Sequence, residues 1–292
     1  MKKAIVRFIQ LILVLIILYS AYKIGSYYYG RYKAEKEFDS YADMVTQAVD
    51  DIDSEDDKDD KEEKTGDKKP KKKNSLDIFS LMTMEDFKKH KTLYDKVAID
   101  SLMKFKEKNE DIVSFINMPG LSVRYPVVFR DNDFYLRRNL QGEYSWAGSI
   151  FLEETNNPNF SDMNTVIYGH NMSNSYIQAA EMFDPIINFS DADYVNSRDE
   201  HYIDIFTMEG VERYKIFSAY FVDAAADYRT SNMDPSYWSE YQEILRQRSI
   251  FDYGDVKFTQ ESKIITLSTC DNVNDDGRFT VHAIRMDIWL II

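Results

Sequence analysis

The run Lys-Ile-Ile-Thr-Leu-Ser-Thr-Cys-Asp, residues 263–271, is the most informative stretch of this sequence. Its β-branched and apolar residues are typical of a buried strand, which is predicted to end where Asp271 and Asn272 begin a polar loop. Cys270, the only cysteine among 292 residues, therefore lies at a predicted strand end, where functional residues concentrate. A lone cysteine is more often a small buried hydrophobe, so a role as nucleophile requires chemical partners.

Two residues at other predicted strand edges could be those partners. His170 follows the apolar run 164–168, and Arg278 comes eight residues after Cys270. The thiolate is the nucleophilic form of cysteine, and a nearby cation favours it. Acyl transfer also needs an acid for the leaving amine and a donor for the oxyanion. A thiol, an imidazole and a guanidinium together supply these functions, and such partners meet in the fold, not along the chain.

The remaining histidines are weaker candidates. His282 alternates within the strand-like run 279–284 and is predicted to be a packed strand residue, although it is a rival to His170. His90 lies in a charged helical stretch and His201 in a polar loop, so both are predicted to be solvated.

Short β-type runs separated by turn signals dominate the second half of the chain and predict an all-β barrel or sandwich decorated by helices. Glu209-Gly210 predicts a hairpin turn between two of these runs. Apolar residues at helical spacing predict helices over 76–109 and 235–247. The predicted strands cover residues 123–129, 148–152, 165–170, 202–208, 211–222, 264–270 and 279–289.

The N-terminus predicts a membrane anchor. An almost unbroken apolar stretch of about 19 residues, from Ala4 to Tyr22, can span a bilayer as a helix if Arg7 reaches the interface. Lys2 and Lys3 favour a cytoplasmic N-terminus. A cleavable signal peptide is the alternative, but the segment that follows the apolar core is a poor cleavage site. Residues 1–30 are thus expected to be an uncleaved anchor with a short cytoplasmic end.

Residues 31–75 are predicted to connect this anchor to the catalytic part. The segment 31–49 has apolar residues at helical spacing, and the charge block 50–74 is predicted to be a disordered spacer, with a wall-polymer contact by its lysine run as the alternative. Residues 76–292 are expected to form one extracellular domain. A single cysteine permits no internal disulfide, so its stability must come from the core.

Composition excludes one class of function and offers no cofactor site. The formal net charge is -14, which argues against nucleic-acid binding. No closely spaced set of His and Cys residues predicts a metal site, and no cofactor is expected.

Three stretches carry a resemblance to a known family: Tyr-Gly-His-Asn at 168–171, Thr-Leu-Ser-Thr-Cys-Asp at 266–271 and Asp-Gly-Arg-Phe at 276–279. Over roughly residues 112–285 the chain resembles the sortases, membrane-anchored cysteine transpeptidases of Gram-positive bacteria, and looks most like class B. The resemblance implies a mainly β fold, an eight-stranded β-barrel with N-terminal helices and one helix inserted between the sixth and seventh strands. The helices predicted over 76–109 and 235–247 fit both additions.

The resemblance also implies an activity. Sortases cleave the sorting signal of a surface protein at a threonine, form a thioacyl enzyme and pass the acyl group to an amine of the peptidoglycan precursor. By this resemblance Cys270 is the nucleophile, His170 the general acid and base, and Arg278 the donor for the oxyanion or substrate. Asp131–Leu136 looks like the segment that lines the signal groove, which suggests substrate contacts from Asn132 and Leu136. The flanking residues expected to line the same groove are Tyr168, Ser268 and Asp271.

Two other functions stay open at this point. One is a thiol hydrolase of another type, which would release peptides to water, although the papain-type signature around the cysteine is absent. The other is an anchored wall-binding domain in which Cys270 is inert.

Overall fold

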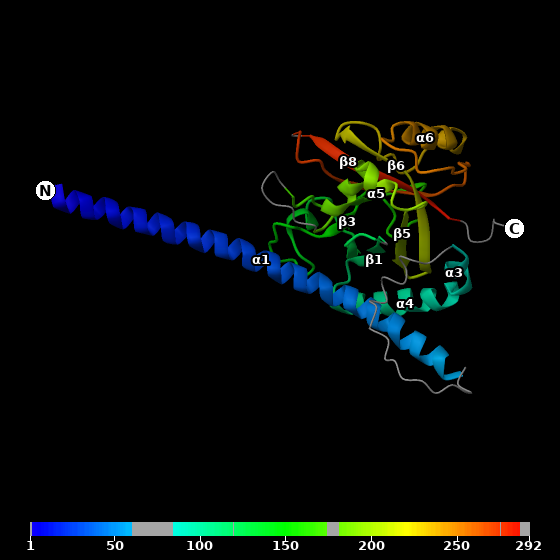
Figure 1. Cartoon of the computed structure of the whole chain (residues 1–292), viewed down its shortest axis with the longest axis horizontal. Helices are drawn as coiled ribbons and strands as arrows, with labels where there is room; N and C mark the ends of the chain where they lie inside the picture. Colours follow the sequence, from blue (N-terminus) through cyan, green and yellow to red (C-terminus); the bar gives the residue numbers. More distant parts are fainter. Residues whose placement is uncertain (1, 60–83, 119, 174–180, 275, 287–292) are drawn as a thin grey trace.

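Eight strands form the centre of the molecule. The computed structural model describes residues 2–59, 84–118, 120–173, 181–274 and 276–286. The strands close into a barrel in the order β1-β2-β3-β4-β7-β8-β6-β5 (Figure 1), which confirms the mainly β, eight-stranded prediction. Their bounds are β1 Ile112–Asn117, β2 Arg124–Val128, β3 Ile150–Leu152, β4 Asn164–Tyr168, β5 Tyr202–Thr207, β6 Gly210–Asp223, β7 Ile264–Cys270 and β8 Gly277–Arg285.

Two pairings in the barrel determine where the candidate site lies. Strands β4 and β7 run parallel with Tyr168 opposite Ser268, so both strands end at the same edge of the barrel. Strands β7 and β8 run antiparallel with Cys270 opposite Arg278. Residues far apart in the sequence are therefore brought to one end of three neighbouring strands.

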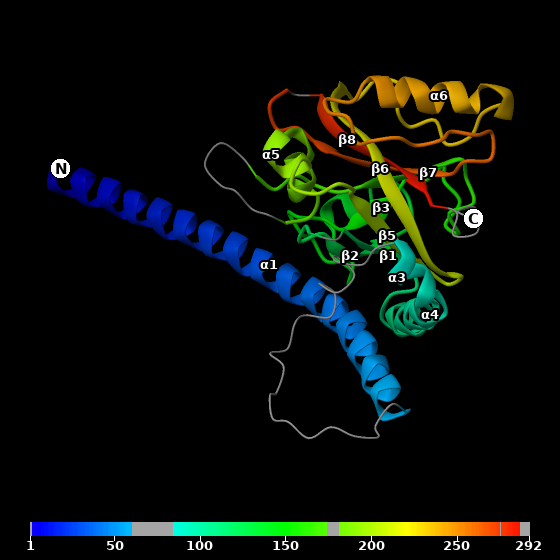
Figure 2. The same ribbon diagram turned by 45° about the vertical axis from the view of Figure 1, so that its right-hand side comes forward.

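Helices cover the barrel on opposite sides (Figure 2). On one side α3 (Met84–Lys89) leads into α4 (Lys91–Lys108), which packs Val97, Leu102 and Phe105 into the main core beside β1, β5 and β6. On the other side α6 (Pro235–Gln247) lies between β6 and β7 in the chain, as predicted. Short helical turns complete the fold: η1 Tyr135–Arg137, η2 Asp184–Ser190 and α5 Ala192–Val195.

The helix α6 follows from local sequence signals. Asp234 caps it by accepting a hydrogen bond from the Ser236 backbone N–H at 2.9 Å, and Pro235 occupies the first turn, where a missing N–H costs nothing. Trp238 is fully buried in a second apolar cluster against β6, β7 and β8, and its indole N–H donates to the Ser262 carbonyl at 2.6 Å. The amphipathic stripe seen in the sequence is thus the face that α6 buries.

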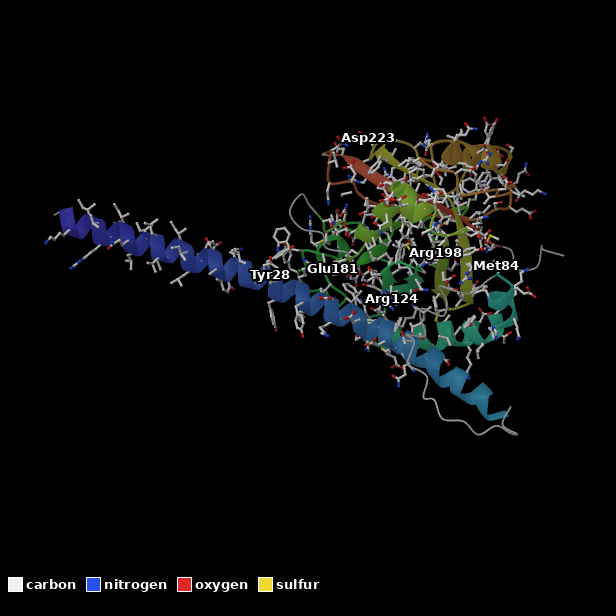
Figure 3. All side chains as sticks on the ribbon, in the orientation of Figure 1. Tyr28, Met84, Arg124, Glu181, Arg198 and Asp223 are labelled. Carbon is white, nitrogen blue, oxygen red and sulfur yellow. The ribbon has the colours of Figure 1, made fainter. Side chains whose placement is uncertain are left out.

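A single helix, α1 (Lys2–Asp59), joins the N-terminal apolar segment to the barrel. Its later part docks by burying Phe38, Tyr41 and Val45, with the Phe38 ring 5.2 Å from that of Tyr125. Its earlier part projects away from the barrel, and Figure 3 shows the side chains there pointing outward on all sides. The helix continues without a break past residue 30 and reaches Asp59, inside the charge block expected to be disordered; the rest of that block lies outside the described residues.

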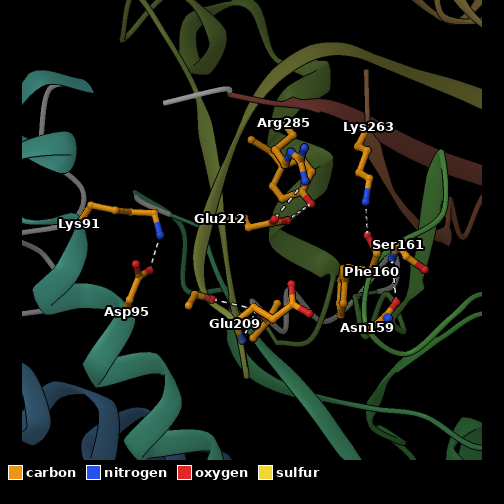
Figure 4. Close-up of polar contacts among 12 residues, drawn as sticks. Lys91, Asp95, Asn159, Phe160, Ser161, Glu209, Glu212, Lys263 and Arg285 are labelled. Atoms are coloured by element: carbon orange, nitrogen blue, oxygen red, sulfur yellow. Dashed lines mark hydrogen bonds and ion pairs between the residues drawn. The ribbon is translucent and has the colours of Figure 1, made fainter. Parts of the chain in front are cut away.

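The β5–β6 hairpin confirms the predicted turn and shows why glycine is needed there. Gly210 has φ of +121°, and a Cβ at this position would clash with the Asp95 carboxylate of α4. That carboxylate accepts a hydrogen bond from the Val211 backbone N–H at 2.8 Å and pairs with Lys91 (Figure 4). Farther along β6, Glu212 forms an ion pair with Arg285 of β8 at 3.1 Å. Helix and sheet are therefore tied together at the hairpin.

Two sequence predictions need correction. The strand β1 was not among the predicted strands, because its residues directly follow a helical pattern and precede the Pro119-Gly120 turn signal. His201 is buried and not solvated: its Nε2 lies 2.9 Å from the Val195 carbonyl oxygen and its ring stacks on Tyr194. The polar residues around His201 in the sequence concealed this packing.

A buried ion pair fixes the register of β5 against β6. The Arg213 guanidinium donates to both carboxylate oxygens of Asp204, at 2.7 and 2.9 Å, and both side chains are fully buried. The guanidinium also lies 4.3 Å from the ring centre of Phe87, which α3 supplies. Bidentate pairing together with an aromatic face compensates in part for the desolvation of the two charges.

We expect Asp204→Asn to destabilise the fold by about 3–5 kcal/mol, because it leaves a buried guanidinium without its counter-charge. Glu243→Gln removes the carboxylate of the more exposed Arg246–Glu243 pair on α6 and should change stability by about 0.5 kcal/mol or less. Urea unfolding of the two variants checks the difference. Equal small effects would show that the Arg213–Asp204 pair does not hold the sheet.

Candidate active site

A cleft of about 220 Å³ opens at the end of the barrel where β4, β7 and β8 meet. Most residues predicted for the site line it, and only Asp271 among them does not. The cleft is also lined by residues that were not singled out from the sequence. The predicted residues in the lining are Asn132, Leu136, Tyr168, His170, Ser268, Cys270 and Arg278, and the additional ones include Phe151, Ala224, Tyr228 and Arg229.

The β7–β8 turn holds Cys270 beside Arg278. The two residues are register partners, Cys270 is half-buried, and an Arg278 N–H donates to the Gly277 carbonyl at 3.0 Å. Asp271 builds the turn: its carboxylate accepts from the backbone N–H groups of Val273 and Asn274 at 2.9 and 3.0 Å. Burial raises the pKa of Asp271, but these hydrogen bonds outweigh it, so the net shift is downward and the carboxylate stays ionised.

Glycine is required inside this turn. A Cβ at Gly277 would clash with the Asp271 carboxylate. The predicted substrate contact of Asp271 has no support from the lining of the cleft, because this side chain is occupied by the turn.

His170 is half-buried and held from a second segment. Its Nε2 lies 2.7 Å from the Leu136 carbonyl oxygen. A carbonyl only accepts, so Nε2 carries the proton and the neutral ring has its lone pair on Nδ1. Desolvation lowers the pKa of His170, with Arg137 adding to the effect and the Leu136 carbonyl opposing it. Near neutral pH the ring of the free protein is therefore mainly uncharged.

The backbone beside His170 approaches its neighbours closely. A Cβ at Gly169 would clash with Ile150 and Phe183, so only glycine fits between the strand end and the core. The Asn171 side-chain amide donates to the Cys270 carbonyl at 3.1 Å, which ties the segment after β4 to the end of β7. His170 and Cys270 are thus held on the same rim by backbone contacts.

The far wall of the cleft is a network around Glu153. This nearly buried carboxylate accepts from the Tyr168 hydroxyl at 2.6 Å and from the Asn132 amide at 2.7 Å. Burial and the Glu153 carboxylate raise the pKa of Tyr168, so its hydroxyl stays protonated and continues to donate. Asn132 and Tyr168 are therefore fixed by a shared acceptor that sequence reasoning did not find.

Tyr228 and Arg229 enter the cleft from the segment between β6 and α6. The Tyr228 hydroxyl lies 3.1 Å from the Ser268 Oγ. A hydrogen bond with the Tyr168 side chain raises the pKa of Arg229. The sequence signal for Tyr228 and Arg229 is weak, because it consists only of an aromatic and a cationic residue in a polar stretch after a long strand.

The rival histidine is structural. His282 is fully buried, with Nδ1 2.9 Å from Thr266 Oγ1 and Nε2 3.0 Å from the Tyr220 hydroxyl. Thr266 donates to Asn164 and so accepts from Nδ1, which leaves Nε2 to accept from Tyr220. This confirms the prediction of a packed strand residue. Within the residues that the structure describes, no group of three or more His, Cys, Asp or Glu side chains could hold a metal ion.

Comparisons with known proteins agree with this geometry. The family model for the sortase domain matches residues 116–286. Sortase B of Listeria monocytogenes is 32% identical over 193 residues, which cover 63% of this chain and 73% of that protein. Sortase B of Staphylococcus aureus is 28% identical over 166 residues, 56% of this chain and 65% of that protein. The crystal structure of Clostridium perfringens sortase B superposes with a TM-score of 0.58 at 29% identity and covers 64% of this chain and all of that one.

The chain belongs to the sortase family, and the relatives and the solved structure named above are sortase B proteins, so it is a class B sortase. It is a cysteine transpeptidase that anchors proteins to the cell wall. The β-barrel with helices before it and one helix between β6 and β7 is the fold of that class.

His282 predicts a specific pH dependence of stability. Burial lowers its pKa to about 3, so below about pH 6.5 the unfolded chain takes up a proton that the folded chain refuses. Stability is therefore lost as pH falls from about 6.5 towards 3, at up to about 1.4 kcal/mol per pH unit from this residue. His282→Gln removes the contribution, so the stability gap between wild type and variant should shrink as pH falls. Urea unfolding at pH 6.5, 5.5 and 4.5 measures this gap, and a constant gap would contradict it.

Proposed function

We propose that Cys270, His170 and Arg278 perform the transpeptidation as nucleophile, general acid and base, and carbonyl donor. One observation carries this proposal: the three side chains come from the ends of different strands and line one cleft. Each supplies a function that thiolate acyl transfer needs, and cleft-lining residues of that kind are the expected site.

In the first step, the Cys270 thiol gives its proton to Nδ1 of the neutral His170, and the resulting thiolate attacks the carbonyl carbon at the scissile bond of a sorting signal, after a threonine. The carbonyl π electrons move to oxygen and form a tetrahedral oxyanion. When the C–N bond breaks, His170 gives its proton to the leaving amine, and the acyl group stays on sulfur as a thioester. The His170 pKa lies below its usual value, which makes the imidazolium a strong acid for this transfer.

Arg278 is proposed to hold the oxygen of that carbonyl. It stands opposite Cys270 in the strand register, and one N–H is used by the Gly277 carbonyl. A guanidinium has five N–H donors in a fixed fork and stays charged, so donors are left for a developing oxyanion.

In the second step, an amine of the peptidoglycan precursor attacks the thioester. His170, now neutral, takes a proton from the amine, and the Cys270 thiolate leaves as the new amide forms. Sorting-signal-bearing surface proteins and this amine are the proposed partners. Leu136 offers an apolar contact, and Asn132, Tyr168 and Ser268 polar ones, to the bound signal.

We further propose a single-pass membrane protein with its catalytic domain outside the cell. The first part of α1 is long and apolar enough to cross a membrane, and its side chains are exposed in this structure. Residues 1–30 would be the anchor, 31–75 the juxtamembrane connection and 76–292 the catalytic domain. Lys2 and Lys3 favour a cytoplasmic N-terminus.

A peptide library tests the proposed chemistry. Wild type should cleave a subset of threonine-containing pentapeptides, give a mass increase on Cys270 equal to the acyl part, and form an amide when oligoglycine or a diaminopimelate peptide is added. Cys270→Ala should abolish all three, and His170→Ala should slow cleavage by about two to four orders of magnitude. His282→Gln is the matched control and should keep its activity when folded.

Turnover by Cys270→Ala would refute the nucleophile. Cleavage that never yields an amide, whichever amine is supplied, would indicate a thiol hydrolase instead of a transpeptidase.

A further inference from the structure

Aromatic side chains cluster where α1 reaches the barrel. Tyr144 and Trp146, in the loop before β3, are 63% and 54% exposed, and the Trp146 ring lies 5.8 Å from that of Tyr144 and 6.5 Å from that of Tyr27 on α1. Tyr28, labelled in Figure 3 at the point where the helix meets the barrel, is also exposed. A group of large exposed aromatic residues marks a surface that binds a protein, a membrane or a ligand.

The position of this cluster along α1 fixes its depth relative to a bilayer. The apolar segment ends at Tyr22, and Tyr27 is five residues later, about 7–8 Å farther along the helix axis. The headgroup region on each side of a bilayer is about 5–8 Å thick. If the apolar segment fills the hydrocarbon core, Tyr27 and the Trp146 ring beside it lie at headgroup level, where Tyr and Trp concentrate in membrane proteins.

The loop also reaches back towards the apolar segment. A hollow of about 590 Å³ lies between α1 and the loop, with Lys23 and Ser26 on one side and Tyr144 and Trp146 on the other. Lys23 is the first residue after the apolar run. The catalytic domain therefore has side chains next to the point where the apolar segment of α1 ends.

Cations lie at this level and at the adjacent end of the apolar segment. The Arg137 guanidinium is 5.7 Å from the ring centre of Trp146 and donates to its carbonyl at 2.8 Å. The Lys23 ammonium lies over the Tyr19 ring at 5.9 Å. Arginine and lysine beside aromatic rings suit a layer of lipid phosphates above acyl chains.

We propose that Tyr144, Trp146 and Arg137 form a second membrane contact, which seats the catalytic domain in the headgroup layer of the bilayer that α1 spans. This inference rests on the proposed membrane anchoring. The partner is a phospholipid surface, bound through interfacial aromatic rings and phosphate–cation contacts.

The contact is linked to the cleft by covalent neighbours. Arg137 follows Leu136, whose carbonyl accepts from His170 Nε2, and both belong to η1. A loop that rests on the membrane thus also forms part of the wall that holds the candidate acid. The cleft would sit at a fixed height above the bilayer because α1 is continuous and docks on the barrel through Phe38 and Tyr41.

Depth-dependent quenching of Trp146 tests the proposal. Full-length protein is reconstituted in vesicles of phosphatidylglycerol and phosphatidylcholine that carry a spin label at the headgroup or deep in the acyl chain. The Trp146→Phe spectrum is subtracted to isolate Trp146. Trp146 should lose most of its emission to the headgroup label and less to the deep label. In the Trp146→Phe background, Tyr144→Trp should behave alike.

Tyr237→Trp in the same background is the matched control. Tyr237 is 63% exposed on α6, on the opposite side of the barrel from α4, and should show no quenching. Alkaline carbonate extraction of the same vesicles separates the two proposals. Protein that resists extraction while Trp146 and Tyr144→Trp stay unquenched would refute the second contact and leave the anchor intact. Protein that carbonate releases would refute both.

Discussion

The parallel pairing of β4 with β7 is the constraint on which the candidate site depends. Tyr168 of β4 lies opposite Ser268 of β7. His170 comes two residues after Tyr168 and Cys270 two residues after Ser268, so both lie at the same edge of the barrel. An antiparallel pairing would send these ends to opposite edges. The Asn171 amide bond to the Cys270 carbonyl and the close approach at Gly169 then fix the two segments beyond the strands.

The β7–β8 turn adds the third group. The Asp271 carboxylate accepts hydrogen bonds from the backbone of the turn, and Gly277 leaves room for that carboxylate. The chain therefore reverses tightly enough to place Arg278 opposite Cys270. The far wall is ordered separately by Glu153, which holds Asn132 and Tyr168. The cleft thus has one side, with His170, Cys270 and Arg278, that is stabilised by hydrogen bonds to the backbone, and a second side, with Asn132 and Tyr168, that is stabilised by one buried carboxylate.

Local patterns predicted what local forces decide. The α6 bounds match because the apolar stripe that predicted the helix coincides with a cap at Asp234 and a proline in the first turn, and His282 was recognised from strand alternation. Features set by tertiary packing escaped: β1 follows a helical pattern directly, and His201 is buried by residues from other elements. Glu153, Tyr228 and Arg229 carry no distinctive spacing, and only the folded barrel brings them to the cleft. The segments around His170, Cys270 and Arg278 stood out through a family resemblance, which spacing alone would not have given.

The role assigned to the β7–β8 register is tested most directly by kcat/KM of Arg278→Lys and Arg278→Ala, with Arg246→Lys on α6 as control. If the guanidinium fork holds the carbonyl beside Cys270, lysine keeps the charge but loses the geometry, and we expect a loss of about 10²–10³-fold, with alanine somewhat worse. The control should match wild type. An Arg278→Lys variant that keeps near-normal kcat/KM would contradict the account, because charge alone would then suffice at this position.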